Sequence, residues 1–562
     1  MGGIMQEKII ILGAGVMQGP AIRIAKELGF FTIVLDGNSA AVNAGMADQF
    51  EQIDLKDKEG IEVFARSLQN SGNLGVMTAG TDFSATVAWV AERLGLPGIP
   101  YEAALNASDK GRMRACFKQA GLPSPVFTTI TSAGELENTT LPALFPLVIK
   151  PVDNMGGRGC RRVNSMEEYH EATADALRFS RSGRAIVEAY MDGPEFSVDA
   201  IVYHGEITIC GLADRHIYFP PFFIEMGHTM PTSFAPEHQE AILETFCAGV
   251  HALGLTGSEN IGAAKGDIKL TPQGPMIGEI AARLSGGYMS GWTYPYASGV
   301  EPIRAAILAA MGRKPDGLVP FKTWTCAERA FISIPGTIKT ITGIEAARRH
   351  PHVQDLFLRI AEGDKVSFPE NNVSKCGNII SAAPDHAAAV ESAETAARSI
   401  LIRLDPADEE TADFLFLPRS EELGEGNEGY CPFPPNAFTL PADLKVALAS
   451  IPETFLSPSV SSESPCLCVK NLRIISFPAF TASNLKDYAG RTVEESLQVV
   501  REITGLPLPE ITEENAKSSD NKSSVLGKSF WTALVRGGYQ GAVYFIDLLG
   551  GETWKNTGLS NP

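Results

Sequence analysis

A lysine at the end of an apolar run, followed directly by a glycine-rich segment, is the strongest chemical signal in the chain. Lys150 closes the run LVIK, and Gly156, Gly157 and Gly159 follow within DNMGGRGC. Such a loop offers backbone N–H groups to phosphate oxygens while the lysine supplies positive charge. The runs LVIK and RRV (161–163) predict two strands joined by this loop. The pattern predicts a phosphate-binding hairpin, although a solvated strand end and a flexible turn have the same composition.

Two carboxylates and an arginine follow further along the chain. Asp267 lies in AAKGDIKL and Glu279 in MIGEIAARLSGG, with the turn TPQGP between them. Carboxylates at the ends of neighbouring strands can share Mg²⁺ ions that bridge nucleotide phosphates. Arg283 comes four residues after Glu279 and can meet an anionic substrate group. Taken singly, each of these residues also fits an ordinary surface position.

A second glycine signal lies near the N-terminus. Gly13, Gly15 and Gly19 follow an isoleucine-rich run, and Asp36 ends the next apolar run. In a dinucleotide fold the glycines let the backbone approach a phosphate, and the acid binds a ribose hydroxyl. The spacing is imperfect, and small residues also serve close strand–helix packing. A Rossmann-type NAD-binding enzyme is therefore one alternative.

The composition limits the partners. The chain has 562 residues, 44% of them apolar and 20% charged, with a formal charge of −19. This is globular composition, and so acidic a protein lacks the cationic surface that nucleic acids or anionic membranes require. No apolar run approaches the roughly 20 residues of a spanning helix. The nine cysteines form no CxxC pair, so we expect a cytoplasmic protein with reduced thiols that contacts neither nucleic acid nor membrane.

The elements that must position these residues alternate between strand and helix, which predicts an α/β fold. Strand, glycine turn, helix and strand repeat in the first hundred residues, as in a doubly wound α/β domain. A helix is expected from Ser108, as N-cap, to Gly121. Further strands are expected in CAERAFISI and NIISAA, and a helix over 386–404.

Four parts are predicted along the chain. A first α/β domain covers 1–105, and a two-lobed α+β domain covers 106–315 with a flap subdomain at about 125–190. A further lobe covers 316–404, and 405–562 form an extension whose role the sequence does not disclose. Within it, 510–524 are polar and predict a mobile loop, whereas the apolar stretch 529–549 is expected to pack onto the rest of the protein.

Taken together, the order of these features resembles the ATP-grasp superfamily over residues 6–404. In that family an α/β domain precedes a helix with a DK pair, a strand lysine with a glycine-rich flap, an adenine hinge, a ribose-binding acid, two metal carboxylates and an arginine. The matching positions here are Asp109-Lys110, Lys150 with MGGRG, Glu188-Ala189-Tyr190-Met191, Glu195, Asp267, Glu279 and Arg283.

The resemblance implies a role for each matching residue. ATP would be held by Lys110, Lys150, Gly156, Gly157, Gly159, Glu188, Ala189, Met191 and Glu195. Mg²⁺ or Mn²⁺ would be held by Asp267 and Glu279, and Lys150 and Arg283 would be catalytic. The family pattern E-x-N-x-R has Ala281 in place of its asparagine here, so another ligand, such as water, would have to complete the second metal site.

Within the superfamily, the stretch 211–236 is similar to the E-x-G-H-x-x-P segment of carboxylate–amine ligases. Glu225, His228 and Pro231 would then line the acceptor side together with Arg283, and Arg215 and His216 are weaker candidates for the same surface. A hydrogen-bonded loop histidine is the alternative for His228. The following lobe resembles that of biotin carboxylase and the dipeptide ligases, and the whole is similar to the ATP-grasp modules of carbamoyl phosphate synthetase.

This resemblance implies an ATP-dependent ligase. Transfer of the γ-phosphoryl group would convert a carboxylate into an acyl phosphate, which an amine attacks with release of ADP and phosphate. Its partners would be small-molecule carboxylates and amines, and a homodimer is compatible with the family. A non-catalytic ATP-binding regulatory protein is the remaining alternative, because the metal-site asparagine is missing.

Overall fold

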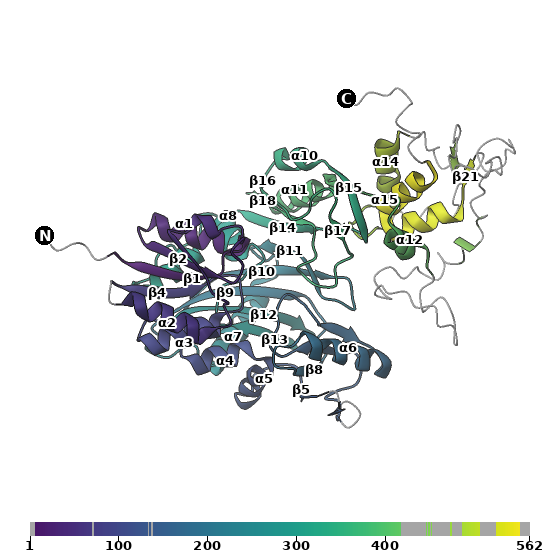
Figure 1. Cartoon of the computed structure of the whole chain (residues 1–562). Helices are drawn as coiled ribbons and strands as arrows, with labels where there is room; N and C mark the ends of the chain where they lie inside the picture. The colour runs from purple at the N-terminus through teal and green to yellow at the C-terminus, as the bar shows by residue number, and fades with distance from the viewer. Residues whose placement is uncertain are drawn as a thin grey trace.

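The computed structural model describes most of the chain, which forms a mixed α/β structure (Figure 1). The described residues are 6–69, 72–132, 134–135, 139–417, 446, 448–449, 451, 472–474, 486–505 and 524–550.

The first sheet is parallel, with strand order β3-β2-β1-β4. Its strands and helices are β1 (Lys8–Leu12), β2 (Phe31–Asp36), β3 (Gln49–Gln52), β4 (Leu74–Thr78), α1 (Gly19–Glu27), α2 (Lys58–Leu68) and α3 (Ser84–Leu94). Alternate residues of β1 enter different cores. Ile9 and Ile11 pack with α1 and with α9 (Pro302–Ala310), whereas Ile10 and Leu12 pack with α2 and α3. Helices therefore cover both faces, which confirms the doubly wound prediction.

The predicted helix over 108–121 is in fact two helices that meet at Asp109. Ser108 ends α4 (Tyr101–Ser108), and its hydroxyl donates back to the Ala104 carbonyl oxygen. Asp109 accepts from the Arg112 backbone N–H and is therefore the N-cap of α5 (Lys110–Gln119). The prediction of Ser108 as N-cap was wrong, because both residue types favour caps and only the backbone turn decides between them.

The central sheet is antiparallel and has eight strands in the order β13-β12-β9-β10-β11-β14-β18-β16. These are β9 (Glu195–Tyr203), β10 (Glu206–Tyr218), β11 (Ile224–Met230), β12 (Ile261–Thr271), β13 (Gly274–Ala281), β14 (Thr325–Phe331), β16 (Val353–Leu358) and β18 (Gly377–Ala383). One part of the sheet packs its apolar side chains against α7 (Pro236–Ala252) and α4. Its polar side chains are left to face the site described below.

A smaller antiparallel sheet, β5-β8-β6-β7, carries the glycine-rich hairpin. It consists of β5 (Phe127–Ile130), β6 (Leu147–Pro151), β7 (Arg161–Val163) and β8 (Ala185–Ala189), and α6 (Met166–Phe179) packs against it. The pairing of Leu147 with Val163 and of Ile149 with Arg161 confirms the predicted hairpin.

Beyond the central sheet, three short strands pair in the order β17-β15-β19. These are β15 (Gly336–Thr342), β17 (Lys365–Val366) and β19 (Leu401–Leu404), with α10 (Ile344–Arg349) and α11 (His386–Ser399) nearby. The predicted strands in CAERAFISI and NIISAA are confirmed as β14 and β18. The helix expected over 386–404 ends at Ser399, because the β-branched and apolar residues that follow form β19.

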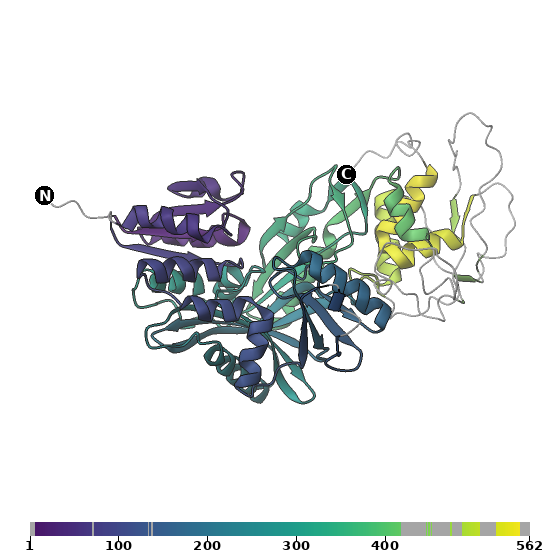
Figure 2. The ribbon, with the colours of Figure 1, turned by 60° about the horizontal axis from the view of Figure 1, so that its bottom comes forward.

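The C-terminal extension packs on this lobe, on the side away from the first sheet (Figures 1 and 2). Its described helices are α12 (Glu409–Phe416), α14 (Val493–Thr504) and α15 (Lys528–Gly550), with short strands β20 (Leu472–Ile474) and β21 (Ser524–Leu526). Side chains of α15 share one apolar cluster with Ile334, Ile402 and Leu415. This confirms that 529–549 pack onto the protein. The loop predicted at 510–524 lies outside the described residues up to residue 523.

Among the described residues, no helix is both long and apolar enough to cross a bilayer. The proposed division at residues 105, 315 and 404 stays a prediction.

The contact between α15 and the lobe gives a stability prediction. Trp531 is 1% exposed within the shared cluster, so Trp531→Ala should cost about 3–5 kcal/mol in the free energy of unfolding. Val319→Ala, at an 80% exposed position, is the control and should change it by less than about 0.5 kcal/mol. Urea denaturation followed by circular dichroism measures both. Equal effects of the two substitutions would contradict the packing of α15.

Candidate active site

A cavity of about 350 Å³ lies between the central sheet and the smaller sheet. Its lining includes almost every residue predicted for the site: Lys110, Lys150, Gly156, Gly157, Glu188, Ala189, Met191, Glu195, Glu225, His228, Asp267, Glu279 and Arg283. Gly159 does not line it, since a side chain there would meet Phe179 and Pro151 instead. His216 lies outside the lining, and its ring contacts the Thr229 hydroxyl at 2.9 Å.

One face of the central sheet supplies many of the acids and bases of the cavity. Asp267 lies across from Glu279 on one side and across from Ser197 on the other. Because side chains alternate between the faces of a strand, Lys265 and Lys269 share the face of Asp267. The two carboxylates lie within paired strands rather than at strand ends as predicted, and the antiparallel register makes them direct cross-strand neighbours.

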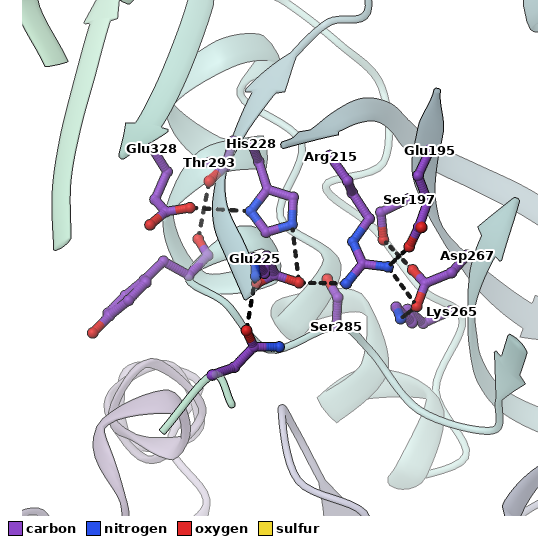
Figure 3. Close-up of polar contacts among 12 residues, drawn as sticks. Glu195, Ser197, Arg215, Glu225, His228, Lys265, Asp267, Ser285, Thr293 and Glu328 are labelled. Atoms are coloured by element: carbon purple, nitrogen blue, oxygen red, sulfur yellow. Dashed lines mark hydrogen bonds and ion pairs between the residues drawn. The ribbon is translucent and has the colours of Figure 1, made fainter. Parts of the chain in front are cut away.

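Arg215 of β10 lies at the centre of this face and bridges three carboxylates (Figure 3). Its guanidinium nitrogens lie 2.5 Å from Glu225 and 2.8 Å from Asp267, and they also pair with Glu195. Burial alone would lower the pKa of Arg215, but the three acids outweigh it and raise the pKa well above its ordinary value. Arg215 therefore stays charged and links acids from three different strands.

Lys110 reaches the same face from the N-terminal end of α5. Its ammonium lies 3.4 Å from Glu279 and donates to the Asn154 carbonyl oxygen beside the flap. Burial alone would raise the pKa of Glu279, but Lys110, Lys265 and Lys150 outweigh it and hold the pKa below its usual range. Glu279 is thus an anion at neutral pH, surrounded by cations.

Glu188 is a buried ion-pair partner rather than a free carboxylate. Its two oxygens lie 2.8 Å from Lys150 and 2.8 Å from Arg114, and the carboxylate and Arg114 are both almost fully buried. Arg114 also donates to the Gly278 carbonyl oxygen at 2.6 Å, next to Glu279. Arg114 therefore links the predicted adenine hinge, Lys150 and the strand that carries Glu279.

His228 lies on strand β11 and is 1% exposed, so it is not a loop histidine. Its Nδ1 lies 3.1 Å from Glu328, and its Nε2 lies 3.7 Å from Glu225 (Figure 3). Burial alone would raise the pKa of Glu225, but His228, Arg215 and Lys375 lower it far below its usual range. The histidine is held between two acids and still lines the cavity.

Arg283 lies at the junction with the first domain. Its Nη1 donates to the Leu284 carbonyl oxygen at 3.1 Å, and its Nε lies 3.9 Å from Asp82. Among the residues that the structure describes, that Nε is buried without a hydrogen-bond partner, as is the Nε of Arg215. Because an unpaired buried donor is costly, both guanidiniums are equipped to bind a further anionic or carbonyl group in the cavity.

The flap closes over the cavity through its glycines. Gly156 and Gly157 have φ of +70° and +77°, a conformation that side chains rarely adopt,. The Asn372 backbone N–H donates to the Gly156 carbonyl oxygen at 2.9 Å, and the Asn372 side chain accepts from the Glu225 backbone N–H. The glycine-rich loop, the lobe and strand β11 are thus joined at Asn372.

The predicted dinucleotide loop is occupied by the protein's own side chains. The Ala14 backbone N–H donates to Asp36 at 2.8 Å, and the Gly15 N–H donates to the Gln18 side chain at 3.0 Å. Gly13 faces the same Gln18 side chain. Amides that would cradle a phosphate are therefore already paired, and the loop gives no support to an NAD-binding enzyme.

The two facing carboxylates suit a magnesium ion. Among the described residues, no group of three His, Cys, Asp or Glu side chains would hold a metal alone. Mg²⁺ is usually bound by one or two carboxylates, with waters and substrate phosphates completing its shell. The donor set of Asp267 and Glu279, both oxygens, fits that chemistry. Ala281 adds no ligand, and its cross-strand neighbour is Lys265.

Two family models match the chain in this region. Residues 143–290 match the ATP-grasp domain, and residues 330–405 match the L-amino acid ligase C-terminal domain 2. The chain contains an ATP-grasp domain. The carboxylates, the phosphate lysine and the flap described above all lie within residues 143–290, so the ATP-grasp domain contains most of the cavity wall, and Lys110 is added from outside the matched range.

Similar proteins include ligases of the ATP-grasp type. The chain is 25% identical over 388 residues to the uncharacterized protein y4rH of Sinorhizobium fredii, covering 67% of this chain and 79% of that protein. It is 35% identical over 131 residues to D-alanine–D-alanine ligase of Marinobacter nauticus, covering 22% of this chain and 39% of the ligase. It is 25% identical over 341 residues to carnosine synthase 1 of Gallus gallus, covering 55% of this chain and 35% of the synthase. The chain thus spans well under half of these two ligases.

The fold is also that of a solved ligase. The crystal structure of L-amino acid ligase from Bacillus licheniformis superimposes with a TM-score of 0.63 at 22% identity, covering 71% of this chain and 99% of that one. Phosphoribosylglycinamide synthetase from Anaerococcus prevotii gives a TM-score of 0.56 at 21% identity, covering 71% of this chain and 100% of the synthetase chain. The ATP-grasp architecture is shared with both, which confirms the fold expected from the motifs.

Several site residues were not predicted from the sequence. These are Arg114, Ser197, Asp199, Lys265, Lys269, Ser285, Glu328, Arg359, Asn372 and Lys375, with Arg215 given too small a part. One signal was available: Glu195, Ser197 and Asp199 alternate with apolar residues, as do Lys265, Asp267 and Lys269. A period of two with polar residues on one strand face predicts a polar sheet face.

The buried link between Arg114, Glu188 and Lys150 gives a second prediction. Arg114→Met leaves Glu188 with one cation, so it should cost about 3–5 kcal/mol in the free energy of unfolding. Glu188→Gln should also be costly, and the double substitution should cost less than the two single ones together. Arg112→Met, two residues earlier in α5 at a solvent-exposed pair with Glu102, should cost less than about 1 kcal/mol. Urea denaturation measures all four variants, and similar losses for Arg112 and Arg114 would contradict the link.

Asp199 gives a third prediction, on pH. Its buried carboxylate accepts from the backbone N–H and the hydroxyl of Ser285, and burial raises its pKa from 3.8 to about 6. The folded protein therefore holds this proton more tightly than the unfolded chain, and the stability it contributes is lost as pH rises from 3.8 to about 6,.

Between about pH 4 and about pH 7, wild type should therefore lose roughly 2 kcal/mol of unfolding free energy relative to Asp199→Asn. Urea denaturation across this pH interval measures the difference. A difference that does not change with pH would show that Asp199 titrates normally.

Proposed function

We propose that the protein is an ATP-dependent ligase that activates a small carboxylate as an acyl phosphate and joins it to an amine, with release of ADP and phosphate. One observation carries the proposal. The facing carboxylates Asp267 and Glu279 line the same cavity as Lys150 and the flap glycines Gly156 and Gly157. Metal-binding acids opposite a phosphate-binding loop suit phosphoryl transfer.

The nucleotide would lie under the flap. Lys110, Lys150 and the amides of Gly156 and Gly157 would bind its phosphates, and the hinge residues Ala189 and Met191 would bind its adenine. Glu188 contributes through Lys150, because both of its oxygens are engaged by cations. Glu195 would take ribose hydroxyls while it is paired with Arg215. Gly159 serves the turn of the flap rather than a contact.

Asp267 and Glu279 would hold Mg²⁺ or Mn²⁺, which when bound would neutralise charge on the phosphate oxygens. The surrounding cations hold the pKa of Glu279 below its usual range, so this acid is ionised and ready for a metal. Arg215 and Lys265, which pair with Asp267 in this structure, would have to share that carboxylate with the ion.

The reaction needs no nucleophilic side chain. The substrate carboxylate oxygen attacks the γ-phosphorus, and the bond from that phosphorus to the β–γ bridging oxygen breaks, so ADP leaves. The amine nitrogen then attacks the acyl carbon and loses a proton, and phosphate leaves. Arg283, whose buried Nε has no hydrogen-bond partner in the described part of the chain, would hold the carboxylate, and Glu225 and His228 would line the acceptor side. The flap would exclude water from the acyl phosphate.

We also propose that the substrates are a small carboxylate and a small amine. The protein would be cytoplasmic and would form a homodimer. A regulatory protein with an inactive ATP site gains no support from the comparisons, whose named members are ligases and synthases.

Hydroxylamine gives the fourth prediction, because it is a small, strong nucleophile that can replace the amine. With Mg-ATP and a panel of amino acids and other small carboxylates, the products should be ADP, phosphate and a hydroxamate, detected as the coloured iron complex and by nucleotide chromatography. Stoichiometric AMP and pyrophosphate would contradict the proposal, because they show attack at the α-phosphorus.

Two variants control this experiment. Glu279→Gln keeps the shape of the metal ligand but removes its charge, so hydroxamate formation should collapse while ATP still binds. Lys150→Ala should weaken ATP binding by about ten- to a hundred-fold, as loss of a charge-assisted contact predicts. Near-full activity of Glu279→Gln at saturating Mg²⁺ would contradict the carboxylate pair.

A further inference from the structure

A second cavity lies where the C-terminal extension meets the lobe that carries β14, α11 and β19. Its volume is about 550 Å³, and none of its lining residues also lines the active-site cavity. The lobe contributes Arg329, Glu394 and Arg398, and the extension contributes residues 486–491 and Tyr539 of α15. We refer to it as the seam cavity. Neither matched family model reaches residues 486–491.

The seam cavity has more cations than acids in its wall. Arg329, Arg398, Lys486 and Arg491 line it, against Glu394 and Asp487. In the part of the chain that the structure describes, the side chains of Arg398 and Lys486 form no ion pair or hydrogen bond. This surplus occurs in a chain whose formal charge is −19.

The acids near the cavity are already engaged. Asp487 accepts from the backbone N–H groups of Ala489 and Arg491, both at 2.9 Å, and from the Ser496 hydroxyl. Glu394 pairs with Arg329 at 3.3 Å. Glu495, whose charge also acts on Arg398 and Arg491, does not line the cavity and accepts from the Thr492 backbone N–H. The positive charge of Arg398 and Lys486 is therefore left for a ligand.

Aromatic rings form much of the remaining wall. Phe219, Phe331, Tyr488 and Tyr539 line the cavity. The Arg491 guanidinium lies 4.8 Å from the Tyr539 ring centroid and is 4% exposed, so it is held in place by the ring,. A cavity with aromatic walls and a few converging charged groups is the usual form of a small-molecule site.

We propose that the seam cavity binds an aromatic organic anion, with a carboxylate or phosphate between Arg398 and Lys486 and its ring against the aromatic wall. This site is separate from the proposed ligase site and needs none of its residues. Arg329 connects the two regions, because its Nη1 donates to the carbonyl oxygen of His228 at 3.0 Å while its Nε faces Glu394 in the cavity wall. A ligand here would therefore contact an arginine that also binds the acceptor strand β11.

Fluorine NMR of the full-length protein tests the site with defined probes. Para-trifluoromethylbenzoate and para-trifluoromethylphenyl phosphate are titrated in the presence of saturating Mg-ADP, and para-trifluoromethylbenzamide is the uncharged control. At least one anion should bind and the amide should bind at least about tenfold more weakly, as loss of a charge-assisted contact predicts. The tighter anion identifies the head group. Equal binding of amide and anions would overturn the proposal.

Matched variants locate the bound probe. Arg398→Gln and Lys486→Gln should each weaken anion binding by about tenfold, whereas Glu394→Gln, which removes a neighbouring negative charge, should strengthen it. Arg398 and Glu394 lie four residues apart on α11. A general loss of folding would weaken anion binding in both variants, so it cannot explain changes in affinity of opposite sign. Lys150→Ala, in the other cavity, should leave the affinity unchanged. If Lys150→Ala abolishes binding and the seam variants retain it, the probe lies in the active-site cavity and the proposal is wrong.

Discussion

The balance of charge on one buried sheet face is the constraint on which the rest of the site depends. Glu195, Glu225 and Asp267 lie on three different strands, and Arg215 contacts all of them. Carboxylates gathered on one buried face repel one another, and the guanidinium between them offsets this repulsion. The central sheet can therefore present the acids proposed to bind a metal only because a cation from a neighbouring strand lies among them.

The same principle extends to the smaller sheet. Arg114 and Lys150 share the carboxylate of Glu188, and Arg114 also binds the backbone beside Glu279. Without these contacts Lys150, on the smaller sheet, would be free to move relative to the carboxylates of the central sheet. The buried triad holds Lys150 in place, so that the smaller sheet and the strands that carry Asp267 and Glu279 keep their relative position.

The C-terminal extension adds a second interface to this architecture. Its long helix α15 completes the apolar cluster of the lobe, and Gln540 donates to Ser333 and to the Ile402 carbonyl oxygen within it. The kink at Gly538, with φ of +55°, brings the helix against Asp487. The loop at 486–491 is thereby held over the lobe, which encloses the seam cavity and connects it through Arg329 to strand β11.

The sequence by itself determined which elements follow one another and where the candidate site residues lie along them. Apolar runs broken by glycines specified the doubly wound sheet and the flap hairpin, and Lys150, Asp267, Glu279 and Arg283 were identified because motif residues keep their spacing along the chain. Such patterns involve residues within one turn or one hairpin, so they can be recognised from the sequence alone. The helix boundary at Ser399 and the cap at Asp109 were missed, because neighbouring residues there have similar local preferences and packing selects between them.

Only the tertiary structure decided which charged residues pair with one another. Arg114 and Glu188 are 74 residues apart and His228 and Glu328 are 100 apart, and register between distant strands depends on the packing of both sheet faces. The same holds for Asp36, which would bind a ribose in the dinucleotide-binding alternative and which instead accepts from the Ala14 backbone N–H. A charged side chain's function depends on the partner that folding brings to it. That partner is fixed by how strands and helices pack together, not by the spacing of residues along the chain.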